Sequence, residues 1–253
     1  MSKKQIDSTI NLFNPISLSD MDKVKFMNRV DTKFVFTYKK LLDILSILTK
    51  DYFILKVKNS FISRYESLYY DCNLNHYNDH HRKKNNRYKI RYRAYKDSKL
   101  TFLEVKHKKK GRTIKSRIPV DEIKFDLPDE HFNFIKNINP NFSKPEPSLM
   151  NNFNRITLVN KKFNERLTID IELSYKWKNR TEEIENIVIA ELKQNNTNRN
   201  SPFYKLMKDN YIRPLKISKY CIGIIDMYGK NKVKYNRFKK KILKLNKLQA
   251  NAS

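Results

Sequence analysis

Residues 87–117 read RYKIRYRAYKDSKLTFLEVKHKKKGRTIKSR, and this stretch contains the clearest structural pattern in the chain. It predicts three successive β-strands, because charged residues alternate with less polar ones. Side chains on a strand point to opposite faces in turn. Arg91 and Arg93 therefore share one face of the first strand, and Glu104 and Lys106 share one face of the second.

The third strand repeats the pattern with Lys115 and Arg117, after a turn at Gly111. A tight turn favours glycine because glycine tolerates positive φ. One solvated, charged face is ordinary in an antiparallel sheet. The same basic face recurs on other segments, however, and crowded like charges disfavour one another. A polyanion held between these faces would explain the recurrence.

The composition points to an acidic partner. The chain has 253 residues, with 54 Lys and Arg against 26 Asp and Glu, for a formal charge of +28. This length suits one large domain or two small ones and is enough for a substantial core. Such a charge is typical of proteins that bind nucleic acid, phosphate polymers, nucleotides or acidic membranes.

Several classes are disfavoured. Two cysteines make no disulfide framework and no zinc site. No leader-like segment and no apolar run of roughly 20 residues is evident, so we expect a soluble, cytoplasmic protein. The closest approach to a P-loop, GIIDMYGK at 223–230, has one residue too many and lacks the Ser or Thr that binds the metal. Phosphates would therefore be held by Lys and Arg side chains.

Periodicity predicts further elements along the chain. Strands are expected at 28–36, 52–58, 67–72, 154–160, 163–175 and 187–194, and helices at 17–27, 38–49, 129–137, 201–208 and 218–228. Residues 74–84 form a helix or an ordered loop, where His76 and His80 have metal-pair spacing but a solvated basic face is the default. Residues 230–247 carry nine Lys or Arg and no acid, which indicates a basic amphipathic helix.

About eight strands with charged faces and apolar backs fit two architectures. One is an open sheet backed by helices, and the other is a closed barrel with its charges inside. The barrel explains more, because its apolar backs join a core and its interior needs a bound anion. Spacing alone leaves the choice open.

The chain resembles the VTC domain, the polyphosphate polymerase branch of the triphosphate tunnel metalloenzymes, also called CYTH-like. The matching segments run in family order. They are RVDTKF at 29–34, SLYYD at 67–71, KIRYRAY at 89–95, LEVKHKKKGRTIKSR at 103–117, NRITL at 154–158, ERLTIDIEL at 165–173, AELK at 190–193 and KISKY at 216–220.

The resemblance implies an α+β fold with an eight-stranded antiparallel β-barrel, a tunnel that holds triphosphate, and helices packed outside. The tunnel domain would span 1–229, followed by a basic C-terminal helix or tail at 230–253. Asp31 stands where tunnel enzymes commonly place Glu. The alternation of Arg29, Asp31 and Lys33 favours the polymerase branch over the simple triphosphatases.

The resemblance also implies site residues, carried over by position. The basic residues expected to act on phosphate are Lys33, Arg91, Arg93, Lys106, Lys115, Arg117, Arg166 and Lys219. Further substrate contacts are expected from Arg29, Arg155, Lys193, Lys216 and Ser218. Glu191 would hold Mn²⁺ or Mg²⁺, and Glu104, Asp170 and Glu172 would help it or pair with basic groups.

The predicted function is transfer of the ATP γ-phosphoryl group to a growing polyphosphate chain, with release of ADP. Phosphoryl transfer depends on positioning and charge neutralisation, which suits a basic, metal-dependent site. Two alternatives remain: an inorganic or nucleotide triphosphatase on the same fold, and a non-catalytic polyanion-binding module. A membrane protein or an acidic membrane surface at the inner face is a further partner class. Nucleic acid is disfavoured, because the tyrosines lie mostly in strands.

Overall fold

The computed structural model describes residues 3–22 and 30–250. The elements, in chain order, are α1 (Lys3–Ile10), β1 (Pro15–Ile16), α2 (Leu18–Asp22), β2 (Val30–Thr37), α3 (Tyr38–Leu48), β3 (Tyr52–Leu55), β4 (Ile62–Asp71), α4 (Asn75–His81), β5 (Asn86–Tyr95), β6 (Leu100–Lys109), β7 (Arg112–Val120), α5 (Asp129–Ile138), β8 (Glu146–Asn160), β9 (Glu165–Trp177), β10 (Arg180–Ile184), β11 (Ile187–Gln194), α6 (Pro202–Asp209), α7 (Lys219–Tyr228), the 3-10 turn η1 (Asn236–Phe238) and α8 (Lys239–Ala250).

One sheet organises the molecule. Its main path runs β2-β11-β9-β8-β4-β5-β6-β7, and every neighbouring pair on it is antiparallel. β3 and β10 add to β8 and β9, and β1 pairs with β3. The α+β class and the path of eight antiparallel strands agree with the prediction.

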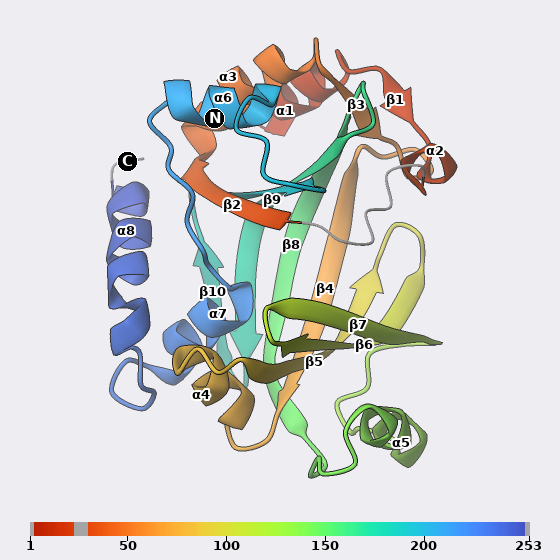
Figure 1. Cartoon of the computed structure of the whole chain (residues 1–253), viewed down its shortest axis with the longest axis vertical. Helices are drawn as coiled ribbons and strands as arrows, with labels where there is room; N and C mark the ends of the chain where they lie inside the picture. The colour runs from red at the N-terminus through yellow and green to blue at the C-terminus, as the bar shows by residue number, and fades with distance from the viewer. Residues whose placement is uncertain (1–2, 23–29, 251–253) are drawn as a thin grey trace.

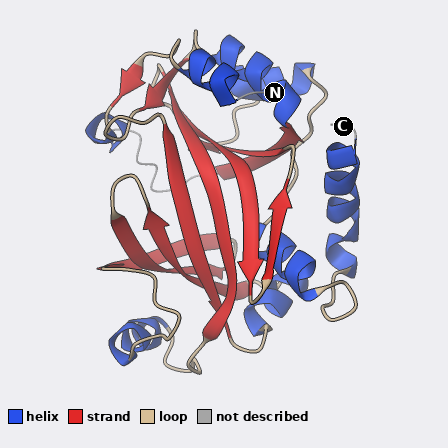
Figure 2. Cartoon of the chain, turned by 180° about the vertical axis from the view of Figure 1, so that it is seen from behind, coloured by secondary structure: helices blue, strands red, loops and turns tan. Residues whose placement is uncertain are grey.

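The sheet is strongly curled. In Figure 1, β2 and the β5–β7 strands cross in front of the long strands β4, β8 and β9. Seen from behind in Figure 2, the long strands lie in front. Among the described strands, none joins β7 to β2, so the expected barrel is a trough without a closed ring of hydrogen bonds. We call its inner side the concave face.

Apolar side chains on the convex side form two cores. α3 places Leu41, Ile44, Leu45 and Leu48 at helical spacing against β2, β8, β9 and β11, together with α1 and α6. Another core joins β4, β5 and β6 to α5 through Ile135. Since the apolar face of each strand is used here, its charged face is left for the inside.

Helix α7 departs from the expectation that the helices pack outside the barrel. α7 packs on the concave side, against Leu149 of β8 and Tyr175 of β9. A Cβ added at Gly223 would lie 2.5 Å from side-chain atoms of both residues. Glycine is therefore required for this close approach, and it brings the first turn of α7 into the trough.

The C-terminal helix is attached to the same core. α8 buries Ile242 and Leu245, and most of its lysines are exposed. The division of the chain at residue 229 remains a prediction. Across residues 3–22 and 30–250, no helix combines the length and the apolar character needed to cross a membrane.

Some predicted strand and helix boundaries differ from those in the structure. β8 starts at Glu146, eight residues before the predicted strand, because Asn151, Asn152 and Asn154 obscure the apolar pattern. A register shift lies between Asn152 and Asn154 where β8 pairs with β9. Of the helix expected at 17–27, α2 covers Leu18–Asp22, and residues 23–29 lie outside the described residues.

Candidate functional site

The concave face gathers basic side chains from most of the sheet and from α7. The strand pairing places Arg91 opposite Glu104, and Glu104 opposite Arg117. On the other side of the trough, Glu191 pairs with Lys33 in register. Arg155 is opposite Asp170 on the floor, where β8 meets β9. Alternation along each strand thus brings predicted site residues from distant segments together.

Asp170 is the central anion of the floor. It is 2% exposed and bonds Arg155 through two contacts of 2.5 and 2.8 Å, and Lys219 of α7 also donates to it. Burial favours the neutral acid, but the two cations more than offset this and hold the pKa of Asp170 well below its usual value. Its role is therefore to pair with the basic groups, one of the two roles expected for it.

Glu104 plays the same part on the β5–β6 wall. Arg91 donates to its carboxylate through Nε and Nη2, at 2.8 and 2.5 Å. Burial opposes the charge on each partner, yet the ion pair raises the pKa of Arg91 and lowers that of Glu104. Because this carboxylate already accepts two charge-assisted bonds, the structure favours pairing over metal binding for Glu104.

Aromatic rings supply the other contacts to the cations. Tyr65 and Phe153 stack with centroids 5.0 Å apart. Arg155 lies 4.8 and 5.1 Å from the two ring centroids, and Arg93 lies 5.5 and 5.7 Å away. Lys219 lies 4.3 Å from Phe153. Cation–π attraction orients these side chains without neutralising them, so their charge stays available to an anion.

The cations exceed their local counter-charges. Burial, reinforced by Arg91 and Arg93, moves the pKa of Lys106 well below its usual range. Burial and then Arg91 lower the pKa of Arg93. Burial lowers the pKa of Lys193 to about 8, against the pull of Glu191. Desolvated like charges at this density are stabilised when an anion binds between them.

Glu191 is the best-placed metal ligand. Lys193 lies 3.2 Å from its carboxylate, and Asp31 supplies a side-chain hydrogen bond. Burial disfavours its charge, but Lys193, Lys33 and Arg155 keep the pKa of Glu191 well below its usual value. In the described part of the chain, no cluster of three or more His, Cys, Asp or Glu could hold a metal alone.

This donor set fits one kind of metal. Mg²⁺ commonly uses one or two protein carboxylates and takes its remaining oxygens from water and substrate phosphates. Glu191 and Asp31 fit that pattern. A structural zinc site would need more ligands. His76 and His80 do not form one, because the described residues place no third ligand with them, and His76 packs against Phe142.

The remaining predicted residues lie toward the edges. Lys115 and Arg117 on β7 and Lys216 before α7 are exposed. Arg166 is half-buried beside Lys193 on the neighbouring strand. Arg29 lies outside the described residues. The site-residue assignments as a whole remain predictions about ligand contact.

Lys89 was missed by the sequence analysis. Its ammonium donates to Ser218 Oγ at 2.8 Å, which joins β5 to the start of α7. Ser218 also accepts from the backbone of Cys221 and so caps the helix. The alternation that linked Arg91 with Arg93 already placed Lys89 on the same face. Tyr65 and Phe153 were also missed, because a ring in a strand usually indicates core packing.

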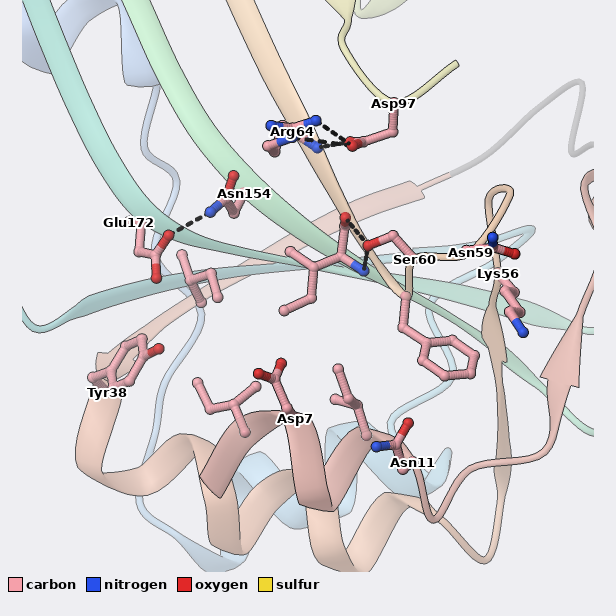
Figure 3. Close-up of a pocket in the computed structure, with 15 residues that line it drawn as sticks. Asp7, Asn11, Tyr38, Lys56, Asn59, Ser60, Arg64, Asp97, Asn154 and Glu172 are labelled. Carbon is pink, nitrogen blue, oxygen red and sulfur yellow. Dashed lines mark hydrogen bonds and ion pairs between the residues drawn. The ribbon is translucent and has the colours of Figure 1, made fainter. Parts of the chain in front are cut away.

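A separate cleft lies on the convex side and is shown in Figure 3. Its volume is about 630 Å³, and Asp7 of α1 and Glu172 of β9 both point into it. Arg64 and Asp97 form an ion pair on its rim. This cleft does not gather the basic residues of the concave face, so we place the candidate site in the trough. Glu172 lines this cleft, whereas Asp170 lies on the floor of the trough, so the two carboxylates belong to different sites.

A comparison with protein families found a match that covers most of the chain. The model of the VTC domain matches residues 28–228. The chain belongs to the VTC domain family. The matched VTC region contains every predicted site residue of the trough and ends at the last residue of α7, whose first turn enters the trough. Among curated proteins, no match was found.

Solved structures show a more distant likeness to this VTC chain. PH1819 protein from Pyrococcus horikoshii is 13% identical, covering 76% of this chain and 96% of the other with a TM-score of 0.42. A Vibrio parahaemolyticus protein described as an adenylate cyclase candidate is 10% identical, covering 78% and 99% with a TM-score of 0.47. Hippeastrum HpAC1, described as having a dominant triphosphatase activity, is 13% identical, covering 78% and 95% with a TM-score of 0.44.

Proposed function

We propose that the protein is a metal-dependent polyphosphate polymerase that uses ATP as its phosphoryl donor. The main support is the concave face, where buried and half-buried cations outnumber the carboxylates that pair with them. VTC family membership supports the same class of chemistry. Phosphoryl transfer in such a site needs alignment and neutralised charge more than a covalent intermediate.

The trough offers a path longer than one triphosphate needs. Arg93, Arg91, Lys89 and Arg87 alternate along one face of β5. At ~3.4 Å per residue these four positions span roughly 20 Å. At this end Lys108 of β6 lies opposite Arg87, and burial, then Arg87 and Lys216, lower its pKa, so further basic groups adjoin the row. A growing chain could follow that surface, whereas a triphosphatase would not require it.

The chain's own residues account for most of the mechanism. Arg91, Arg93 and Arg155 would hold phosphate oxygens in bidentate fashion, while Lys106 and Lys219 act as point charges. Asp170 and Glu104 keep these groups charged and oriented. A divalent ion held by Glu191 and Asp31 would bridge phosphate oxygens and offset charge on the transferred group. Half-burial of the site would limit water as a competing acceptor.

The proposed reaction transfers the γ-phosphoryl group of ATP in a single displacement. A terminal oxygen of the polyphosphate chain attacks the γ-phosphorus of ATP, and the bond from that phosphorus to the β,γ-bridging oxygen breaks. ADP leaves with the bridging oxygen. The chain becomes one phosphate longer.

Purified protein incubated with ATP and Mn²⁺ should produce a polyphosphate ladder on a stained gel. Glu191→Gln should abolish the ladder, because it removes the charged metal ligand. Glu183→Gln, on the exposed strand β10, is the matched control and should leave it unchanged. Free phosphate without a ladder would establish the triphosphatase alternative. Tight triphosphate binding without either product would establish a binding module.

A further inference from the structure

A row of aromatic rings runs along the concave face, from the centre of the site to its rim. Phe153 stacks on Tyr65, and Tyr65 lies 5.0 Å from Tyr95. Tyr95 meets Phe102 edge to face at 5.9 Å. Arg117 ends the row, with its guanidinium 4.4 Å from the Phe102 centroid. The row therefore crosses four strands and reaches exposed β7.

The outer rings of this row differ from the core aromatics. Tyr92, on the opposite face of β5, is fully buried in the core under α5. Tyr95 and Phe102 are half-buried, and they pack on each other and on the row. Half-buried rings beside an exposed arginine retain apolar surface that a flat ligand can cover.

The outer part of the row lies past the basic residues of β5. On one face of β5 the order from the C-terminal end is Tyr95, Arg93, Arg91 and Lys89. α7 packs farther along, where Tyr69 of β4 meets Tyr220. One end of the trough therefore carries the outer rings of the row, and most of the basic residues of β5 lie toward the other end. A ligand that is flat and apolar at one end and polyanionic at the other matches this order.

We propose that the outer rings of the row, Tyr95 and Phe102, together with Arg117, bind the nucleobase of the nucleoside triphosphate donor. This inference rests on the proposed function and assigns the direction in which the donor lies. The triphosphate lies over Arg93, Arg91 and Arg155, and the growing chain extends toward Lys89 and Arg87.

The chemistry of the row suits a nucleobase. Bases stack on aromatic side chains and on planar guanidinium groups, and each such contact is largely tolerant of base identity. Arg117 can cover the second face of a base that lies against Phe102. An inorganic triphosphate carries no flat apolar group, so it gains nothing from these rings.

Binding to two ligands separates the row from the rest of the site. The ligands are ATP with a β,γ-imido bridge, which resists transfer, and inorganic triphosphate. Tyr95→Leu and Phe102→Leu should each weaken the imido analogue by about tenfold, the loss of one stacking contact, and leave triphosphate affinity unchanged. Tyr88→Leu, on the opposite face of β5, is the matched control and should change neither affinity.

The outcomes are distinct. Equal losses for both ligands, or no loss for the analogue, would overturn the nucleobase assignment while the proposed function stands. A wild-type protein that binds neither ligand would overturn the proposed function itself. Retained triphosphate affinity in a variant also shows that its site is folded.

A measurement on the wild-type protein avoids variants altogether. Ribose 5-triphosphate keeps the sugar and the phosphates of ATP and lacks the base. It should bind about tenfold more weakly than the imido analogue if the rings hold the base. Equal affinity of the two compounds would exclude base stacking.

Discussion

At the scale of single residues, several cations of the site contact the same carboxylate or the same aromatic ring. Asp170 serves both Arg155 and Lys219, and two stacked rings serve Arg93, Arg155 and Lys219. Few anions thus orient many cations. The site therefore has more cations than carboxylates, and this excess of positive charge favours a polyanionic ligand.

Asp170→Asn should destabilise the free protein strongly. Two half-buried cations would lose the buried carboxylate that they share, and breaking a buried ion pair in this way costs about 3–5 kcal/mol. Urea unfolding would measure the loss. Triphosphate should restore more stability to this variant than to the wild type. Glu122→Gln, in an exposed pair with Lys124, is the control, and equal effects of the two changes would contradict the argument.

Triphosphate binding should take up protons at pH 8.5. Burial lowers the pKa of Lys219 to about 8, so part of its population is neutral in the free protein at that pH. A bound anion favours the ammonium and raises this pKa, which draws a proton from solution. Affinity should accordingly fall as pH rises above 8. Calorimetry in two buffers of different ionisation heat measures the uptake.

Lys219→Met removes the titrating group from the same measurement. This variant should take up fewer protons than the wild type at pH 8.5. Net proton release by the wild type on binding would contradict the expected sign.

At the scale of elements, α7 connects the core to the site. Its buried face packs under β8 and β9, and its first turn carries Ser218, as the cap, and Lys219. Lys33 donates to the carbonyl of Ile217, just before the helix, at 3.2 Å. Any shift of α7 away from the sheet would therefore move Ser218 and Lys219 and break the Lys33 contact.

Gly223→Ala tests this connection. Alanine would gain about 1 kcal/mol of helix propensity, but its Cβ would overlap Leu149 and Tyr175 at 2.5 Å. Overpacking of this kind costs about 1–3 kcal/mol, so we expect a lower melting temperature and weaker triphosphate binding. Asn246→Ala on the exposed side of α8 should do neither. Unchanged affinity in Gly223→Ala would show that α7 does not position the site.

At the scale of the whole molecule, the net charge of +28 includes two basic regions that differ in their exposure to solvent. The concave face holds desolvated cations, which we propose bind a short anion. The basic end, formed by Arg87, Lys108 and Lys216, presents more exposed charge that suits a long one. Exposed charges are screened by salt to a greater extent than buried ones.

Long-chain polyphosphate should therefore bind with a steeper salt dependence than triphosphate, because it meets more cations. Lys108→Ser combined with Lys216→Ser should reduce the salt slope for the long chain and leave triphosphate binding nearly unchanged. Affinity measured at several NaCl concentrations tests this. An equal change for both ligands would place these two lysines in the short-anion site.

The sequence by itself determined the parity of the strands. Alternation put Arg91 with Arg93 and Glu104 with Lys106, and segment order indicated the VTC family, because both properties are local to the chain. The same alternation placed Lys89 on this face, where only the contact with Ser218 revealed its connection to α7. Helix α3 was also predicted from the spacing of its apolar residues.

Tertiary structure alone decided which charges meet. The pairing of Asp170 with Arg155 and Lys219 joins three segments far apart in the chain, and nothing local specifies it. The curl of the sheet, the entry of α7 at Gly223 and the ring row from Phe153 to Phe102 depend in the same way on long-range packing. Periodicity reports which face a side chain takes, while strand order and curvature set its neighbours across that face.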